Sequence, residues 1–278
     1  MYLVTGASGQ LGMELRTLLG NSAFYADREE LDVASEDAIK NFLSKRRFDF
    51  IINCAAYTAV DKAESEPEKA EDVNHLGAGW LAKYGKNIIH ISTDYVFDGK
   101  NFVPYLEDDR TNPVSIYGRS KLAGEQAVLK NADTAVIIRT AWLYSAYGNN
   151  FLKTMLRLGK EHDHLNVVSD QIGTPTFARD LAKAIVKILS LIPAGKKSIY
   201  HFTNEGVCSW YDFAHAIMKI SGLSCQIYPI ESKNYPTKAI RPFYSVLNKE
   251  KIKSDFNLEI PHWRDALVEV LNDMKETE

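Results

Sequence analysis

The fold is decided by the first twelve residues, Met1-Tyr2-Leu3-Val4-Thr5-Gly6-Ala7-Ser8-Gly9-Gln10-Leu11-Gly12. A short apolar strand leads into three glycines spaced three apart, and a helical run with Leu15, Leu18 and Leu19 follows until Gly20. In a dinucleotide-binding unit the first glycine permits the tight turn, the second lets a pyrophosphate approach, and the third lets helix pack on strand. Ordinary strand-to-helix turns also use glycine, but the flanking strand and helix supply the context that this motif requires. The residues expected to contact a dinucleotide here are Gly6, Ser8, Gly9, Gln10, Leu11 and Gly12.

A second short strand, 22–26, ends in Asp27-Arg28, where the adenosine ribose of a dinucleotide should lie. An acidic residue at this place suits a free 2′-hydroxyl, and an arginine suits a 2′-phosphate. The adjacent pair leaves the choice between NADH and NADPH open. Asp32 and Val33 are expected at the adenine edge, although Asp32 is equally a candidate cap for a helix over 35–45.

The third strand, 48–53, is followed by Cys54-Ala55-Ala56-Tyr57-Thr58. These side chains are small enough for a cofactor to lie across the strand end, so Ala55, Ala56 and Tyr57 are expected to contact it. The long helix that follows contains Asn74. Asn74 is either an ordinary polar residue of that helix or a buried amide that holds a water or backbone group in register.

A fourth strand, 87–91, places Thr93 and Asp94 at its carboxyl end, which is the ligand edge of an open parallel sheet. Tyr117 and Lys121 then lie four residues apart on a predicted helix, so they share one face with Cβ atoms roughly 5–6 Å apart. An ammonium beside a phenol lowers the phenol pKa from its usual value of about 10. Tyr117 is therefore a candidate proton donor and acceptor. Tyr-x-x-x-Lys is also common by chance, and a helical tyrosine often only packs.

A fifth strand, 134–139, carries Trp142 just beyond its carboxyl end. The indole is either part of the core or a platform over a ligand, and its place at the ligand edge favours the platform. The rest of the sequence predicts a mixture of helices and strands. The sequence thus predicts an α/β protein with a Rossmann-type doubly wound parallel sheet in residues 1–150. A smaller mixed α/β substrate-binding domain is expected in 151–278, with segments that can return to the first sheet.

Composition narrows the class of protein further. A net charge of −3 and the absence of a Lys/Arg-rich block argue against a nucleic-acid partner. No apolar run reaches membrane-spanning length, and a strand that starts at Met1 leaves no room for a signal peptide. Three cysteines cannot pair completely and match no metal spacing, which favours a reducing cytoplasm. His162-Asp163-His164 has no third ligand nearby, so solvent-facing side chains are expected there rather than a metal site.

Taken together, these motifs resemble the extended short-chain dehydrogenases/reductases, and within them the dTDP-4-dehydrorhamnose reductase family. The likeness covers essentially the whole chain. The glycine motif and the Tyr/Lys pair specify only the superfamily. Other motifs in the likeness are Asn53-Cys54-Ala55-Ala56-Tyr57-Thr58, Ser92-Thr93-Asp94-Tyr95-Val96-Phe97 and Asp170-Gln171-x-Gly173-x-Pro175. The much narrower stretches, which carry the assignment, are Ala55-Ala56-Tyr57-Thr58-Ala59-Val60-Asp61-Lys62-Ala63-Glu64 and Ser92-Thr93-Asp94-Tyr95.

This resemblance implies reduction of the C4 keto group of dTDP-4-dehydro-β-L-rhamnose to dTDP-L-rhamnose with NADPH or NADH. Tyr117 would protonate the C4 oxygen, Thr93 would hydrogen-bond it, and Lys121 would hold the nicotinamide ribose and lower the pKa of Tyr117. Asn150 and Arg241 are candidates for the nucleotide end of the substrate, although Arg241 could instead belong to a structural ion pair. The expected substrate-binding residues are Val60, Thr93, Asp94, Tyr95, Tyr117, Trp142, Asn150 and Arg241.

Two rival functions remain open at this stage. One is another sugar-nucleotide enzyme of the superfamily, a 4-epimerase or a 4,6-dehydratase. The resemblance places an Asp-Glu pair after the threonine of dehydratases, whereas Asp94-Tyr95 stands here. The other is a catalytically silent subunit, like the reductase-like beta subunit of methionine adenosyltransferase, which would not need Thr93, Tyr117 and Lys121.

The resemblance also bears on metal and assembly. Some family members form a magnesium-bridged homodimer that uses a glutamate just after the glycine loop, and Glu14 matches this position. The expected second glutamate aligns with Arg179, and a guanidinium repels a divalent cation, which needs several oxygen ligands. Glu14 could more simply be an exposed first-turn acid, favoured by the helix dipole. We therefore expect no metal, and a monomer or at most a weak homodimer.

Overall fold

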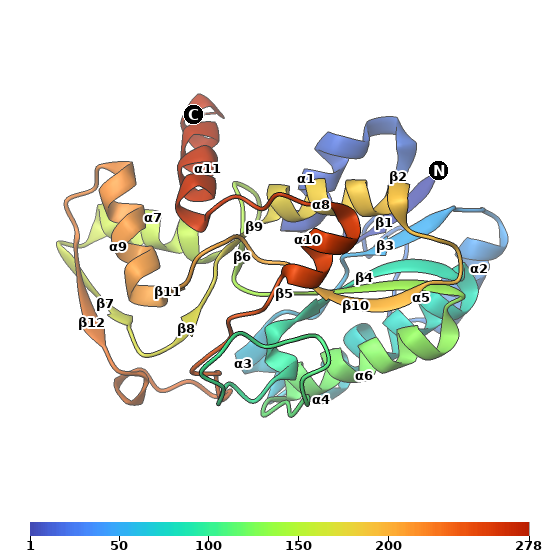
Figure 1. Cartoon of the computed structure of the whole chain (residues 1–278), viewed down its shortest axis with the longest axis horizontal. Helices are drawn as coiled ribbons and strands as arrows, with labels where there is room; N and C mark the ends of the chain where they lie inside the picture. Colours follow the sequence, from blue (N-terminus) through green and yellow to red (C-terminus); the bar gives the residue numbers. More distant parts are fainter. Residues whose placement is uncertain (278) are drawn as a thin grey trace.

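The computed structural model describes residues 1–277, and its centre is a six-stranded parallel sheet (Figure 1). The strand order is β10-β5-β4-β3-β1-β2, so the order reverses between β1 and β3. Ligands bind at such a switch point, outside the carboxyl ends of the strands. The predicted fold class is confirmed. The strands are β1 (Tyr2–Thr5), β2 (Ala23–Ala26), β3 (Phe50–Asn53), β4 (Asn87–Thr93), β5 (Thr134–Thr140) and β10 (Lys197–His201).

Both faces of the sheet are covered by helices, because the central strands are apolar on both sides. Val4, Ile52 and Ile89 point to one face, and their neighbours Leu3 and Ile51 point to the other. The first face packs on α1 (Gln10–Leu19), α8 (Ala178–Leu191) and α10 (Glu250–Phe256). The second packs on α2 (Glu36–Ser44), α5 (Ala78–Gly85) and α6 (Ile116–Asn131), and Figure 1 shows these two helical layers above and below the sheet.

A smaller unit lies beside the sheet and has an apolar core of its own (Figure 1). Its parallel pair β7 (His164–Val168) and β12 (Gln226–Ile230) packs with helices α7 (Phe151–Glu161), α9 (Trp210–Ser221) and α11 (Trp263–Thr277). A capping box between Ser209 and Asp212 begins α9. Short strands form two pairs outside the main sheet: β6 (Leu143–Tyr144) with β9 (Thr176–Phe177), and β8 (Ile172–Gly173) with β11 (Cys208–Ser209).

Residues after position 150 contribute to both units. Helix α8 packs on α1, and β10 pairs with β5 at the edge of the main sheet. The division into residues 1–150 and 151–278 stays a prediction. Within residues 1–277 no helix is long and apolar enough to cross a membrane.

The start of α2 corrects one expectation. Ser35, not Asp32, caps this helix, because the Ser35 hydroxyl accepts from the Ala38 N–H at 3.3 Å. The Asp32 carboxylate instead accepts from the Ala34 N–H at 3.0 Å in the preceding turn.

A buried ion pair joins α6 to the sheet. Arg139 of β5 and Glu125 of α6 are 2% and 1% exposed, and they form two parallel hydrogen bonds, Nε–Oε1 at 2.9 Å and Nη2–Oε2 at 2.8 Å. The hydroxyl of Ser92 on β4 also donates to the Glu125 carboxylate, at 2.5 Å. Helix α6 and strands β4 and β5, which carry or flank Thr93, Tyr117 and Lys121, are therefore held to one another by one carboxylate.

We expect Glu125→Ala to lower the free energy of unfolding by about 3–5 kcal/mol, because it leaves the Arg139 charge buried without its partner. Urea denaturation measures the loss. Glu161→Ala serves as the matched control, since it breaks the exposed Arg157–Glu161 pair, which is worth only about 0.3–0.5 kcal/mol. Equal losses in the two variants would show that the buried pair does not hold the helix.

Candidate active site

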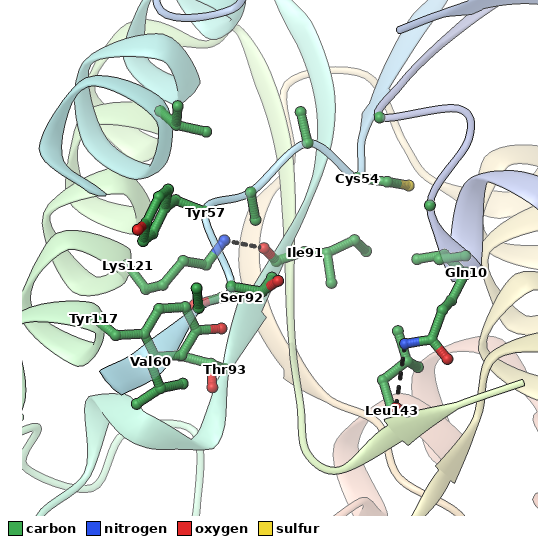
Figure 2. Close-up of a pocket in the computed structure, with 18 of the residues that line it drawn as sticks. Gln10, Cys54, Tyr57, Val60, Ile91, Ser92, Thr93, Tyr117, Lys121 and Leu143 are labelled. Atoms are coloured by element: carbon green, nitrogen blue, oxygen red, sulfur yellow. Dashed lines mark hydrogen bonds between the residues drawn. The ribbon is translucent and has the colours of Figure 1, made fainter. Parts of the chain in front are cut away.

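One large cavity of about 1140 Å³ opens at the carboxyl ends of β1, β3, β4 and β5 (Figure 2). It is the place where the sheet order predicts a ligand. Of the residues expected at the site, the structure brings all but Asn150 to its wall: Gly6, Ser8, Gly9, Gln10, Leu11, Gly12, Asp27, Arg28, Asp32, Val33, Ala55, Ala56, Tyr57, Val60, Thr93, Asp94, Tyr95, Tyr117, Lys121, Trp142 and Arg241.

The glycine-rich loop needs its glycines. Gly6 has a φ of +64°, and a Cβ there would lie 2.8 Å from the backbone of Ala55 at the end of β3. At Gly12 a Cβ would lie 2.5 Å from the Gly6 carbonyl oxygen. The loop therefore packs directly against the backbone that follows β3. The N-terminus of α1 faces the cavity. Asp27 accepts a hydrogen bond from the Ser8 N–H at 2.7 Å, which places its carboxylate beside the loop.

Asn74 fixes the floor of the cavity between β3 and α6. It lies in a π-helical turn, Asp72–Gly77, and is fully buried. Its Oδ1 accepts from the Tyr57 N–H at 2.9 Å, and its Nδ2 donates to the Tyr57 carbonyl at 3.1 Å and the Ser120 hydroxyl at 3.0 Å. The alternative in which this buried amide holds backbone in register is therefore the one the structure adopts. A π-turn at a functional site follows a common pattern.

Lys121 is buried on α6, with Ser115 as the cap of this helix. Its Nζ donates to the Ile91 carbonyl at 2.6 Å (Figure 2). Burial lowers the pKa of Lys121 to about 8, although the nearby Glu125 carboxylate acts to raise it. At pH 7 Lys121 is therefore still largely protonated. Its hydrogen bond to Ile91 holds it against β4, the strand that ends at Thr93.

Tyr117 points into the cavity next to Thr93 (Figure 2). Burial raises the pKa of Tyr117 above its ordinary value, and a hydrogen bond with Thr93 only partly offsets this. The expected net lowering of this pKa is wrong for the structure, because burial in the low-dielectric site disfavours the phenolate more than the Lys121 ammonium, which bonds the Ile91 carbonyl, can favour it. The phenol is therefore protonated at neutral pH, the form from which a proton can be donated.

Asp94 lies immediately after Thr93 and is 2% exposed. The Thr93 hydroxyl donates to Asp94 Oδ1 at 2.9 Å and accepts from the Tyr95 N–H at 3.2 Å. Asp94 Oδ2 is buried with no hydrogen-bond partner in residues 1–277. Burial raises the pKa of Asp94 to about 6, and hydrogen bonds from Thr93 and Ser245 act against it.

Trp142 forms part of the wall but does not stand alone. It adopts a left-handed backbone with φ +49° and stacks on Trp210 of α9, with ring centroids 3.6 Å apart and an interplanar angle of 11°. Both indoles line the cavity. Trp210 was missed from the sequence, because nothing in its helical pattern indicates that it meets residue 142.

Arg241 lines the cavity and also belongs to an ion pair. Its Nη2 lies 2.7 Å from Asp61 Oδ2, and its Nη1 donates to the Tyr95 hydroxyl at 3.4 Å. The rings of Tyr95 and Tyr117 in turn pack edge to face, with their centroids 5.4 Å apart. The structure is thus compatible with both roles considered for Arg241, because the guanidinium lines the cavity and also forms an ion pair with Asp61.

Asn150 lies beside the cavity-lining residues Gly148 and Asn149 but is not itself part of the lining. Its side chain caps α7, with Oδ1 accepting from the Lys153 N–H at 3.0 Å. Its Nδ2 donates to Gln10 Oε1 at 2.9 Å and to the Ser145 carbonyl at 2.8 Å. These bonds occupy both ends of the amide, and Asn150 is not among the residues that line the cavity, so its assignment to the nucleotide end of the substrate stays a prediction.

Glu14 is a buried residue of α1 rather than an exposed first-turn acid. Arg179 Nε lies 3.0 Å from Glu14 Oε2, and its Nη1 also approaches Glu269 and Asp273 of α11. The guanidinium therefore lies among the carboxylates where a cation would have to sit. Residues 1–277 contain no group of three or more His, Cys, Asp or Glu side chains placed to hold a metal ion.

Comparison with known proteins places this geometry in a family. Residues 1–276 match the family described as RmlD substrate binding domain. The chain belongs to the RmlD family. The resemblance to the dTDP-4-dehydrorhamnose reductases that the motifs predicted is therefore confirmed.

Individual relatives are similar over their whole length. The chain is 42% identical to the spore coat polysaccharide biosynthesis protein SpsK of Bacillus subtilis, over 98% of this chain and 96% of that protein. It is also 42% identical to a dTDP-4-dehydrorhamnose reductase of Aggregatibacter actinomycetemcomitans, over 95% and 96% of the two chains. A dTDP-4-dehydrorhamnose reductase of Bacillus anthracis, solved in complex with NADP, superposes with a TM-score of 0.94 at 36% identity and 98% coverage of both chains.

The buried Asp94 carboxyl predicts a pH-dependent stability difference. Because its folded-state pKa of about 6 lies above the ordinary 3.8, its contribution to stability is full below about pH 3.8 and is lost as pH rises through 6. Asp94→Asn has no such loss. The Tm of this variant relative to wild type should therefore rise from pH 4 to 7 and level off by pH 8, as thermal melts would show. A Tm difference that stays constant over this range would contradict the prediction.

Proposed function

We propose that this chain reduces the C4 keto group of dTDP-4-dehydro-β-L-rhamnose to dTDP-L-rhamnose with NADPH or NADH. The observation that carries the proposal is the convergence of Thr93, Tyr117 and Lys121 on the same cavity as the glycine-rich loop. A bare nucleotide-binding module would need the loop alone. A family of reductases supplies the substrate class, because two-fifths of this chain is identical to a dTDP-4-dehydrorhamnose reductase over nearly its full length.

The loop residues fit a dinucleotide. Gly6 and Gly9 leave room for a pyrophosphate beside the N-terminus of α1, and Asp27 lies at the end of β2 where the adenosine ribose belongs. The neighbouring Arg28 has a side chain 85% exposed and only a 3.7 Å contact with Asp32, so it is free to turn toward a 2′-phosphate. The pair is compatible with both NADPH and NADH. The nicotinamide, when bound, supplies the hydride.

The chain's own residues supply the one proton that completes the reduction. As hydride adds to the C4 carbon, the carbonyl π electrons move to oxygen, and Tyr117 transfers its phenolic proton to that oxygen. Burial keeps the phenol protonated before the step. The Lys121 ammonium, nearby on the same helix, favours the phenolate that remains. Thr93 hydrogen-bonds with Tyr117 and orients it, and it can turn from Asp94 to the C4 oxygen.

Around the sugar, we assign Val60, Asp94, Tyr95 and Trp142 to substrate contacts. Asp94 offers a buried acceptor without a partner in the described chain, which suits a sugar hydroxyl. The stacked pair of Trp142 and Trp210 offers an apolar wall. Arg241 is assigned to the nucleotide diphosphate, because its guanidinium lines the cavity and can bind phosphate oxygens.

We also propose that the protein works in the cytoplasm as a monomer or weak homodimer, without nucleic-acid or membrane partners. Cys54, Cys208 and Cys225 are all free thiols, which suits a reducing compartment. The Arg179 guanidinium at Glu14 supports independence from a divalent cation.

The direct test follows absorbance at 340 nm with purified protein and dTDP-4-dehydro-L-rhamnose, in parallel with NADH and NADPH. Oxidation of either nucleotide together with formation of dTDP-L-rhamnose is expected. No oxidation with either cofactor would overturn the proposal in favour of a silent regulatory subunit. Release of water or epimerisation of a dTDP-hexose without net oxidation of cofactor would favour the dehydratase or epimerase alternative.

Tyr117→Phe should lower kcat by at least roughly 10²-fold, because the general acid is lost while the ring is kept. The dissociation constant of NADPH, measured by fluorescence titration, should change little. Tyr228→Phe serves as a matched control, since it removes an exposed phenol hydroxyl that does not line the cavity. A Tyr117→Phe variant with near wild-type kcat would exclude the assigned role.

Chelation should leave both rate and assembly unchanged, because Arg179 neutralises the buried Glu14 carboxylate without a metal. The test compares initial rates and light-scattering mass before and after EDTA treatment, and again after magnesium is restored. A dimer that dissociates with EDTA while activity falls would contradict this expectation.

A further inference from the structure

The Gln10 side chain connects two parts of the cavity wall that are far apart in sequence. Gln10 begins α1 within the glycine-rich loop, but its amide reaches the segment 142–150 beyond β5 (Figure 2). Nε2 donates to the Leu143 carbonyl at 3.4 Å. Oε1 accepts from the Asn150 amide at 2.9 Å and the Ser145 hydroxyl at 3.3 Å. The amide therefore makes three bonds to one loop.

The segment 142–150 forms the opposite wall of the same cavity. Trp142, Gly148 and Asn149 line it. The backbone is unusual at two places, with φ +49° at Trp142 and +62° at Gly148. A Cβ at Gly148 would lie 3.3 Å from Gln10 Cγ, so the loop packs closely on this side chain. Asn150 links this segment to the smaller unit, because its side chain also caps α7.

We propose that Gln10 is a positioning residue that couples dinucleotide binding at the glycine-rich loop to sugar-nucleotide binding at the loop 142–150. The inference rests on the proposed function. A diphosphate bound at the N-terminus of α1 orders the first turn of the helix, and the first turn carries Gln10. The three hydrogen bonds then hold the wall that includes Trp142 in the conformation that accepts the sugar.

Coupling of this kind is reciprocal: each ligand raises the affinity for the other by the same factor. Gln10→Ala removes the amide but keeps a residue that favours the helix, so the glycine loop retains its own backbone contacts. The expected loss is therefore in the coupling factor rather than in the affinity for the dinucleotide alone. A residue that merely touched the cofactor would lower that affinity whether or not sugar nucleotide is present.

The experiment measures the dissociation constant of dTDP-L-rhamnose by calorimetry, with and without saturating NADP⁺. For the wild type we expect about fivefold or more tightening by the dinucleotide, the usual lower range of such coupling. In Gln10→Ala the factor should fall below about twofold, with NADP⁺ affinity by itself changed less than threefold. Gln226→Ala, which removes the exposed partner of the Tyr228 hydroxyl on β12, should keep the wild-type factor.

A second variant approaches the contact from the other loop. Asn150→Ser keeps an oxygen to cap α7 but removes the amide donor to Gln10, so it should lower the coupling factor as well. The double variant should lower it no further than the larger single effect, because both changes break the same contact. This variant also decides the matter if Gln10→Ala does not fold, as judged by circular dichroism.

The outcomes separate the two proposals. A wild-type protein that binds neither NADP⁺ nor dTDP-L-rhamnose would overturn the proposed function itself. Binding of both ligands without coupling in the wild type, or full coupling in folded Gln10→Ala and Asn150→Ser, would overturn the role of Gln10 while leaving the reductase assignment intact.

Discussion

The buried pair of Arg139 and Glu125 is the interaction on which the site depends. A carboxylate that binds a guanidinium through two hydrogen bonds and also accepts from Ser92 fixes the rotation and height of α6 against β4 and β5. Tyr117 and Lys121 lie two turns and one turn before Glu125 on the same helix face. This contact, together with the hydrogen bond from Lys121 to the Ile91 carbonyl, holds them beside Thr93. Separating the buried pair would leave an unpaired buried charge, so the arrangement is strongly favoured.

Burial, rather than the neighbouring ammonium, sets the protonation of the groups that we assign to the reaction. The low dielectric keeps the Tyr117 phenol protonated, lowers the pKa of Lys121 to about 8 and raises that of Asp94 to about 6. For a reduction this is the useful direction, because the acid must carry its proton before charge develops on the carbonyl oxygen. The stabilising effect of Lys121 is then exerted on the phenolate that the reaction creates.

The cavity belongs to both halves of the chain. The first half of the chain supplies the glycine loop after β1 and the Tyr117/Lys121 pair on α6, whereas Trp210 and Arg241 come from later segments. Gln10 and Asn150, 140 residues apart, meet in a hydrogen bond that closes the wall between them. The stacked indoles of Trp142 and Trp210 likewise join an early and a late segment of the chain, through apolar surface. The site is therefore assembled by packing between segments, not by any one of them.

The sequence by itself determined the parallel α/β fold, the glycine loop and the Thr93, Tyr117 and Lys121 positions. These features depend on local patterns, such as glycine spacing, apolar strands and a four-residue helical repeat, which can be read along the chain. Only the tertiary structure decided that Asn150 caps a helix and that Trp210 joins the site. It also decided that burial outweighs Lys121 at Tyr117. Each of these depends on which distant groups meet and how much water they exclude, and those quantities exist only once the chain has folded.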